Sequence, residues 1–198
     1  MLDKSVQSGR APLAEHRDDF YATPPEAVRA LLEVEKFSGT IWEPACGDGA
    51  IVKVLRDAGH LVYATDLVER GCPDSESRVD FLFEQPPGIH IGAIVTNPPY
   101  ALAKPFVAHA ILLGVPKVAM LLRLAFLEGS GRSSILDTGL LARVYVFKNR
   151  LPMMHRDGWT GKKVSNAIPF MWLVWELGWN KPAELHRISW KKSTNSGS

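Results

Sequence analysis

The fold is decided by the stretch Thr40-Ile41-Trp42-Glu43-Pro44-Ala45-Cys46-Gly47-Asp48-Gly49. An apolar run of the kind found in buried strands leads into an acidic residue and a Gly-x-Gly turn. Residues 50–59 then have the pattern of a helix that ends at Gly59. Strand, glycine turn and helix together predict the first half of a Rossmann-like unit, which binds a ligand at the carboxyl end of its strand.

The composition of this turn favours a cationic ligand over a phosphate. The dinucleotide pattern G-x-G-x-x-G is incomplete because Val52 stands at its third glycine. Glu43 and Asp48 would repel a pyrophosphate. Asp66 ends the next apolar run, residues 61–66. An acidic residue at that place can accept hydrogen bonds from both hydroxyls of a ribose, and an ordinary turn residue is the structural alternative.

A second informative stretch, Asn97-Pro98-Pro99-Tyr100, follows the buried strand predicted over residues 92–96. Its two prolines fix φ and remove two backbone donors, so the strand must end in a rigid corner. The side-chain oxygen of Asn97 and the carbonyl of Pro98 could accept both N–H groups of a planar amine, such as adenine N6 or a carboxamide. Tyr100 could stack on that plane. The structural alternative is a proline-punctuated loop with a buried tyrosine.

Three segments of the sequence resemble those of one enzyme family. Asn-Pro-Pro-Tyr after a strand resembles the catalytic motif of S-adenosylmethionine-dependent amino-methyltransferases, which modify adenine N6 or the glutamine side-chain nitrogen. Glu-Pro-Ala-Cys-Gly-Asp-Gly at residues 43–49 resembles the cofactor motif of the adenine methyltransferases. Residues 21–26, Tyr-Ala-Thr-Pro-Pro-Glu, resemble the segment that covers the cofactor in adenine-N6 DNA methyltransferases. The order of the three is similar to that of non-permuted members, including small phage or prophage members.

The resemblance implies a fold, a cofactor and a set of site residues. The fold is α/β, a Rossmann-like class I methyltransferase with a mostly parallel twisted sheet, helices on both faces and an antiparallel edge hairpin. The catalytic residues would be Asn97, Pro98, Pro99 and Tyr100. The residues that would bind S-adenosylmethionine are Tyr21, Thr23, Pro24, Glu43, Ala45, Cys46, Gly47, Asp48, Gly49, Asp66, Asp80, Phe81 and Asn97.

Two of these assignments have structural alternatives. By resemblance, Asp80 accepts from the amine of the cofactor's adenine and Phe81 packs on its face. A buried phenylalanine beside a surface aspartate is the alternative. Thr23 could instead cap a helix with Pro25 in its first turn.

The C-terminal third contains two further apolar runs, residues 142–147 and 168–176, which we expect to pair as an antiparallel edge of the sheet. Their connection, residues 148–167, is long and basic, and long connections of particular composition tend to be functional. Basic residues with an interleaved aromatic suit phosphate contact and base stacking, whereas the alternative is a solvated hairpin loop. The residues predicted to contact nucleic acid are Arg123, Lys148, Arg150, Arg156, Trp159, Lys162 and Lys163.

The charge distribution also indicates a polyanionic partner. The net charge is +2, but residues 1–139 carry 13 Lys and Arg against 18 Asp and Glu, whereas residues 140–198 carry 10 against 3. We expect a flexible arm over residues 1–19, a single methyltransferase domain over residues 20–190 and a disordered tail over residues 191–198. This leaves no room for a separate target-recognition domain. Sequence specificity should therefore be short or weak, or be supplied by a partner subunit. For the assembly, a homodimer and a complex with a specificity partner both stay open.

The sequence contains no apolar run long enough to span a bilayer and no signal-peptide pattern. Its two cysteines provide neither a disulfide framework nor a metal cluster. We therefore expect a cytoplasmic protein with no membrane and no metal partner.

The function predicted from these features is methyl transfer from S-adenosylmethionine to the N6 amine of adenine in DNA. The target base would be flipped out of the helix and stacked on Tyr100. The alternatives are an RNA adenine methyltransferase, a protein glutamine methyltransferase, and a cofactor- or DNA-binding module of a larger assembly.

Overall fold

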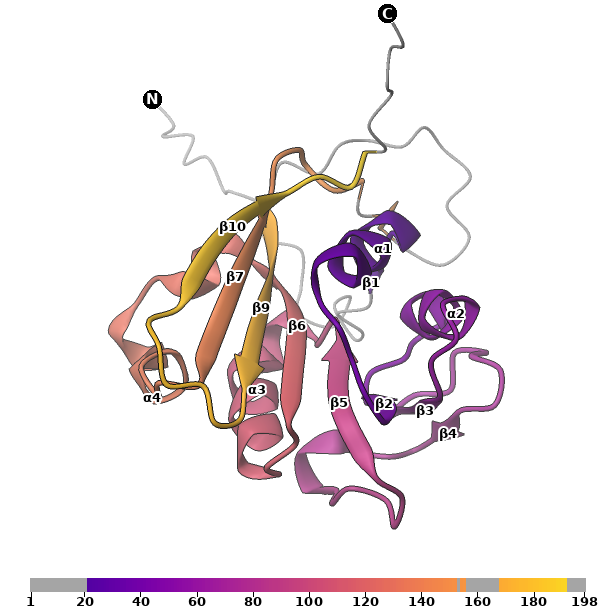
Figure 1. The fold of residues 1–198 in the computed structure, drawn as a ribbon. Helices are drawn as coiled ribbons and strands as arrows, with labels where there is room; N and C mark the ends of the chain where they lie inside the picture. Colours follow the sequence, from indigo (N-terminus) through magenta and orange to yellow (C-terminus); the bar gives the residue numbers. More distant parts are fainter. Residues whose placement is uncertain (1–20, 153, 156–167, 192–198) are drawn as a thin grey trace, which may run out of the picture.

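The chain builds one large sheet with helices packed on both of its faces (Figure 1). The structure, a computed structural model, describes residues 21–152, 154–155 and 168–191. The strands lie in the order β10-β7-β9-β6-β5-β2-β3-β4. Their bounds are β2 (Thr40–Glu43), β3 (Val62–Asp66), β4 (Glu76–Ser77), β5 (Ile91–Thr96), β6 (Lys117–Arg123), β7 (Leu141–Phe147), β9 (Phe170–Glu176) and β10 (Glu184–Ile188).

The central strands are apolar on both faces, because both faces are covered. Every residue of β5 is buried, and successive side chains point to opposite sides. Val95 belongs to the core under α1 (Pro25–Val34) and α2 (Ala50–Asp57). Its neighbour Ile94 belongs to the core with α3 (Ala103–Leu112) and α4 (Ser133–Leu136). Strands β2 to β6 are parallel, so the predicted Rossmann-like sheet is confirmed.

The two C-terminal runs pair as predicted, but they do not form the edge of the sheet. β9 lies between β6 and β7 and is antiparallel to both. β10 then pairs parallel with β7 and becomes the outermost strand. Four of its five residues are exposed and only Ile188 is buried. The strand therefore has no apolar pattern from which it could have been predicted.

The segment before α1 differs in one detail from the expectation. Pro25 is the first residue of α1, as predicted, but Pro24 is its N-cap residue and no side chain caps it. Thr23 is buried and points elsewhere. Just before it, β1 (Tyr21–Ala22) pairs antiparallel with β8 (Met154–His155). The segment expected to cover the cofactor is thus held against the chain that follows β7.

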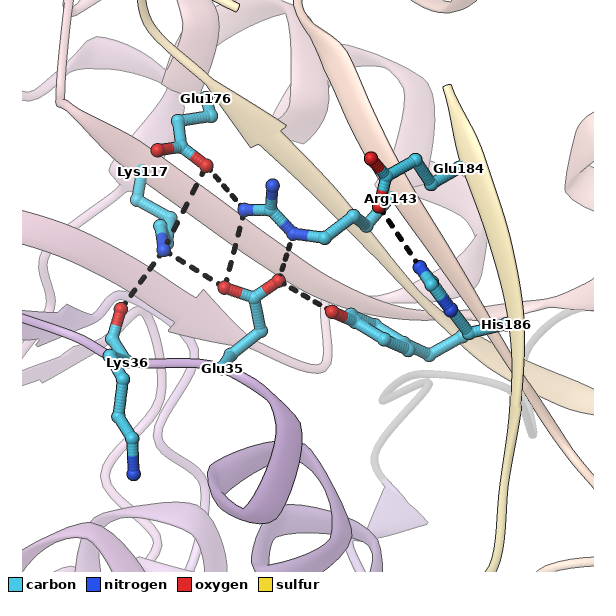
Figure 2. Close-up of polar contacts among 8 residues, drawn as sticks. Glu35, Lys36, Lys117, Arg143, Glu176, Glu184 and His186 are labelled. Atoms are coloured by element: carbon cyan, nitrogen blue, oxygen red, sulfur yellow. Dashed lines mark hydrogen bonds and ion pairs between the residues drawn. The ribbon is translucent and has the colours of Figure 1, made fainter. Parts of the chain in front are cut away.

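A cluster of charged side chains fixes the other end of α1 (Figure 2). Glu35, which follows the helix and is only 4% exposed, accepts from Arg143, from Lys117 at 2.9 Å and from the Tyr145 hydroxyl at 2.8 Å. Arg143 also pairs with Glu176 at the carboxyl end of β9. Lys117 begins β6, so the cluster lies at the edge of the sheet opposite to the carboxyl ends of the parallel strands.

Some expectations concern residues beyond the described ranges. The arm expected at residues 1–19 and residues 192–198 of the expected tail lie outside them. In the part of the chain that is described, no helix has the length and apolar character needed to cross a membrane.

Candidate active site

A cavity of about 300 Å³ lies at the carboxyl ends of the parallel strands. Its walls come from the loops after β2 and β3, the corner after β5, and Thr23 before α1. Nine of the residues predicted to form the site line it: Thr23, Ala45, Cys46, Asp48, Asp66, Asp80, Phe81, Asn97 and Pro99. The topology therefore gathers residues from five separate segments at the place where parallel α/β sheets bind ligands.

Asp66 joins two of these loops. One carboxylate oxygen accepts from the backbone N–H of Gly47 at 2.8 Å, and the other accepts from the N–H of Val68 at 2.8 Å. An ionised carboxylate has about four acceptor sites, so these two bonds leave capacity for hydroxyl groups in the cavity. Asp66 is half-buried and lines the cavity, a position compatible with the predicted ribose contact.

In the glycine turn, Gly49 is required for a reason other than the close approach of a ligand that the sequence suggested. Gly49 has a φ of +85°, and a Cβ there would lie 2.9 Å from the Sγ atom of Cys72. The residue is therefore constrained by backbone conformation and by a thiol from the loop after β3. Cys72 and Cys46 are free, buried thiols packed with Val52. Burial raises the pKa of the Cys46 thiol.

Glu43 lies behind the cavity wall and is fully buried. Its Oε1 atom accepts from the Thr96 hydroxyl at 2.6 Å and from the Ala45 N–H at 3.2 Å. Its Oε2 atom has no hydrogen-bond partner among the described residues. Burial raises the pKa of Glu43 to about 8, although the two hydrogen bonds lower it and Asp66 raises it further. The carboxyl group thus links the ends of β2 and β5 and holds its proton at neutral pH.

Asp80 and Phe81 were predicted either to contact the adenine of the cofactor or to have a purely structural role, and their positions are compatible with both. Asp80 accepts from the Leu82 N–H at 3.1 Å and so caps the 3₁₀ turn η2 (Phe81–Phe83). Phe81 is 1% exposed, and its ring meets those of Trp42 and Phe106 at centroid distances of 5.2 and 4.9 Å. Both residues also line the cavity. The turn is therefore part of the core and part of the cavity wall at once.

In the corner after β5, Asn97 lies toward the cavity and Tyr100 lies toward β9. The Nδ2 atom of Asn97 donates to the Thr23 hydroxyl at 3.1 Å, and Asn97 lines the cavity. Tyr100 begins the 3₁₀ turn η3 (Tyr100–Leu102) and does not line the cavity. Its ring packs beside Phe170 at 5.8 Å, and the guanidinium of Arg123 lies 4.2 Å from its centroid. The predicted stacking residue thus faces the start of β9.

The remaining predicted residues lie around the cavity or outside the described ranges. The backbone of Tyr21 is in β1, and Pro24 is the N-cap residue of α1. Gly47 and Pro98 do not line the cavity. Lys148 and Arg150 are exposed beyond the end of β7. The four predicted nucleic-acid contacts that lie outside the described residues are Arg156, Trp159, Lys162 and Lys163.

Several lining residues were not predicted. Leu67, Val68 and Arg70 come from the loop after β3. Leu102 is the N-cap residue of α3, and Phe106 lies in the first turns of that helix. The spacing of four between Leu102 and Phe106 places them on one side of a helix, which is a usable signal only once that helix is known to border the site. The loop residues carry no signal of their own.

Comparisons with known proteins establish the fold. No family model matches the chain, and no curated protein matches it. Among solved structures, the 23S rRNA methyltransferase ErmE is similar at 16% identity with a TM-score of 0.55, over 83% of this chain and 70% of that one. A dimethyladenosine transferase from Plasmodium falciparum is similar at 16% identity with a TM-score of 0.52, over 79% and 63%.

A modification subunit assigned to a type I restriction enzyme of Vibrio vulnificus YJ016 is also similar, at 14% identity with a TM-score of 0.52. The match covers 88% of this chain but only 48% of that subunit, so the chain spans about half of its length. At these identities the likeness concerns the fold alone. The fold is that of the Rossmann-like methyltransferases, and in this chain β10 is the outermost strand at the antiparallel end of the sheet.

Proposed function

We propose that this protein transfers the methyl group of S-adenosylmethionine to the N6 amine of adenine in DNA. The proposal rests chiefly on the position of Asn97, whose side chain lines the cavity while Tyr100, three residues later, faces the opposite side of the corner. A cofactor in the cavity and a planar group beside Tyr100 would then meet at Asn97.

The residues of the cavity fit S-adenosylmethionine. Asp66 and Asp80 offer acceptors for ribose hydroxyls and for an adenine amine, and Phe81 offers an apolar contact in the same cavity. Asp48 is an exposed carboxylate at the same rim, suited to an ammonium group. The volume of about 300 Å³ lies at the lower end of the roughly 300–1,000 Å³ typical of ligand pockets. When bound, the cofactor supplies an electrophilic methyl group on a positively charged sulfur.

The orientation of the Asn97 amide supports its role in holding the amine. Because its nitrogen donates to Thr23, its oxygen is turned the opposite way. This oxygen and the carbonyl of Pro98 would accept the two N–H groups of adenine N6 and hold the nitrogen in line with the methyl group. No strong base is required, since the nitrogen becomes more acidic as it is alkylated and can release its proton afterwards.

A nucleic acid is the substrate class that the surface charges favour. Lys148 and Arg150 are exposed just beyond the carboxyl end of β7, on the same edge of the sheet as the cavity. The similar structures are named as a 23S rRNA methyltransferase, a dimethyladenosine transferase and a modification subunit of a type I restriction enzyme. DNA is preferred to RNA because of the resemblance of residues 21–26 to DNA methyltransferases.

The test is transfer of labelled methyl from S-adenosylmethionine to four acceptors: duplex DNA, single-stranded DNA, structured RNA and a cell protein extract. Digestion to nucleosides should yield labelled N6-methyladenine from DNA. Label in RNA or in glutamine would replace the proposed substrate but keep the reaction class. Absence of label in all four acceptors would favour a binding module and contradict the proposal.

Asn97→Ala provides the matched variant. Transfer should be lost while S-adenosylhomocysteine still binds by calorimetry, because the amine loses its acceptor and the loops after β2 and β3 still supply the rest of the cavity. Asn180→Ala is the control, since Asn180 is exposed and follows β9 at the opposite edge of the sheet. Full activity in the Asn97 variant would exclude the assigned role.

A further inference from the structure

Arg123 occupies one face of the Tyr100 ring, on which a base is expected to stack. It is the last residue of β6, and its guanidinium carbon lies 4.2 Å from the centroid of the Tyr100 ring. This is well within the roughly 6 Å at which a cation is attracted to an aromatic face. A guanidinium is planar and stacks on rings much as a nucleobase does. A base that enters on this face must therefore take the place of the guanidinium.

Arg123 also lacks the anionic partner that a half-buried arginine normally has. Its Nε atom is buried and makes no hydrogen bond within the described part of the chain, and none of the ion pairs described there includes it. Arg143, which is also half-buried, pairs with both Glu35 and Glu176. Burial of an arginine without a carboxylate is costly, so Arg123 is suited to bind an anion that arrives with a ligand.

The surroundings of Arg123 indicate where that anion would lie. Arg123 pairs with Phe170 in the register of β6 and β9, and Val146 of β7 pairs with the next residue of β9. The carboxyl end of β7 is thus two strands from Arg123, about 10 Å away. Lys148 and Arg150 are exposed just beyond that end. A nucleic-acid strand along this edge would bring its phosphates past all three cations.

We propose that Arg123 is a specificity-determining residue that stands in for the target base on Tyr100. It leaves the ring for a phosphate of the nucleic acid when the base enters. The exchange makes entry depend on a polyanion, so adenine in a polynucleotide is accepted, whereas free adenosine and glutamine amides are rejected. This inference rests on the proposed function for its choice of base.

The first experiment does not require methyl transfer. In the free protein, NMR should show the side-chain protons of Arg123 shifted upfield by the Tyr100 ring. Addition of a short adenine-containing DNA duplex should remove this ring-current shift, whereas free adenosine at the same concentration should not. If the duplex leaves the shift unchanged, or if adenosine removes it equally well, the inference is overturned.

The second experiment compares Arg123→Ala with Arg132→Ala as the matched control. Arg132 also stacks on a ring, that of Phe126 at 4.8 Å, but it lies in the segment after β6 and does not line the cavity. Arg123→Ala should raise KM for the duplex roughly tenfold, reduce the salt slope of binding by about 1, and increase transfer to free adenosine relative to DNA. Arg132→Ala should change none of these ratios.

The outcomes separate this inference from the proposed function. If no acceptor is methylated but the duplex still removes the ring-current shift, the proposed reaction fails while the exchange at Tyr100 stands. If DNA is methylated but Arg123→Ala keeps the wild-type ratio of DNA to adenosine, the reaction stands and the role of Arg123 is refuted.

Discussion

The side-chain nitrogen of Asn97 donates a hydrogen bond to the Thr23 hydroxyl across 3.1 Å, and this contact joins segments 74 residues apart. Thr23 is only 4% exposed, so its hydroxyl is a defined acceptor in a sheltered place. Thr23→Val keeps the shape of the side chain but removes the acceptor. One hydrogen bond of this kind contributes about 0.5–1.5 kcal/mol, so if it serves to orient the Asn97 amide we expect kcat for methyl transfer to fall roughly 2- to 13-fold.

Thr23→Ser is the control for this prediction, because serine keeps the hydroxyl and should remain close to wild type. The affinity for S-adenosylhomocysteine separates the two possible roles of Thr23. A variant with reduced kcat and unchanged affinity indicates that Thr23 acts by positioning Asn97. A variant whose defect lies in affinity alone would show that it acts on the cofactor instead.

The raised pKa of Glu43 should make stability depend on pH. The unfolded chain holds this proton only below about pH 4.5, whereas the folded protein holds it up to about pH 8. Between these values the folded state binds more protons, so the free energy of unfolding decreases as pH rises. The total decrease is on the order of 5 kcal/mol. Glu43→Gln, which is neutral throughout, should lose this part of the pH dependence.

Urea unfolding at about pH 5 and about pH 9 measures the effect. Glu69→Gln is the control, since Glu69 is exposed in the loop after β3 and its replacement should leave the pH dependence unchanged. If wild type and Glu43→Gln lose the same free energy between the two pH values, Glu43 is ionised in the folded protein and the prediction is wrong.

Substitutions at Gly49 and Gly59 can separate two contributions to the free energy of unfolding, namely backbone strain and steric overlap with a neighbouring side chain. Both have φ near +85°, but a Cβ at Gly59 would meet no atom within 4 Å, whereas one at Gly49 would lie 2.9 Å from Cys72 Sγ. Gly59→Ala should therefore destabilise by about 1–2 kcal/mol from backbone strain alone. Gly49→Ala should cost more, and Cys72→Ala in the same chain should recover the excess. Equal losses in the two single variants would contradict this.

Glu35 should contribute strongly to stability. Burial raises its pKa, but hydrogen bonds from Arg143, Lys117 and Tyr145 outweigh this effect, and the pKa lies below its usual value. Its contribution is therefore complete above about pH 4.5 and is lost as the pH falls. Glu35→Gln would leave both cations with Glu176 alone and should cost up to roughly 3–5 kcal/mol.

The midpoint of urea unfolding near neutral pH tests this expectation, with Glu33→Gln as the control on the same helix. Glu33 is exposed, so its replacement should change stability by less than about 0.5 kcal/mol. A Glu35 variant as stable as this control would mean that the cluster contributes nothing net.

The sequence was sufficient to predict those elements whose pattern lies within one short stretch of the chain. The strand ending at Glu43, the glycine turn and α2 follow one another directly, and each has its own pattern of apolar residues, glycines and acids. The strand before Asn97 and the corner formed by the two prolines are recognisable for the same reason. From these local units the position of the cavity follows through the rule for parallel sheets.

The rest depends on contacts that no short pattern encodes. The exposed strand β10 forms by pairing with β7 and not by burying an apolar face, as Leu185 at 66% exposure illustrates. The contact between Arg123 and Tyr100 arises because the chain after β5 passes over the end of β6. The sequence identified Gly49 as a requirement but not its reason, which is a thiol 23 residues away.

The helix α1 joins two anchors at opposite edges of the sheet. Ten residues of helix span about 15 Å, with Thr23 just before the first turn and Glu35 just after the last. The carboxyl end of the helix is therefore held by the ion pairs of Glu35, and the residue before its amino end, Thr23, holds the Asn97 amide through a hydrogen bond. Loss of the ion pairs at that far end would let the helix shift and would carry Thr23 away from Asn97.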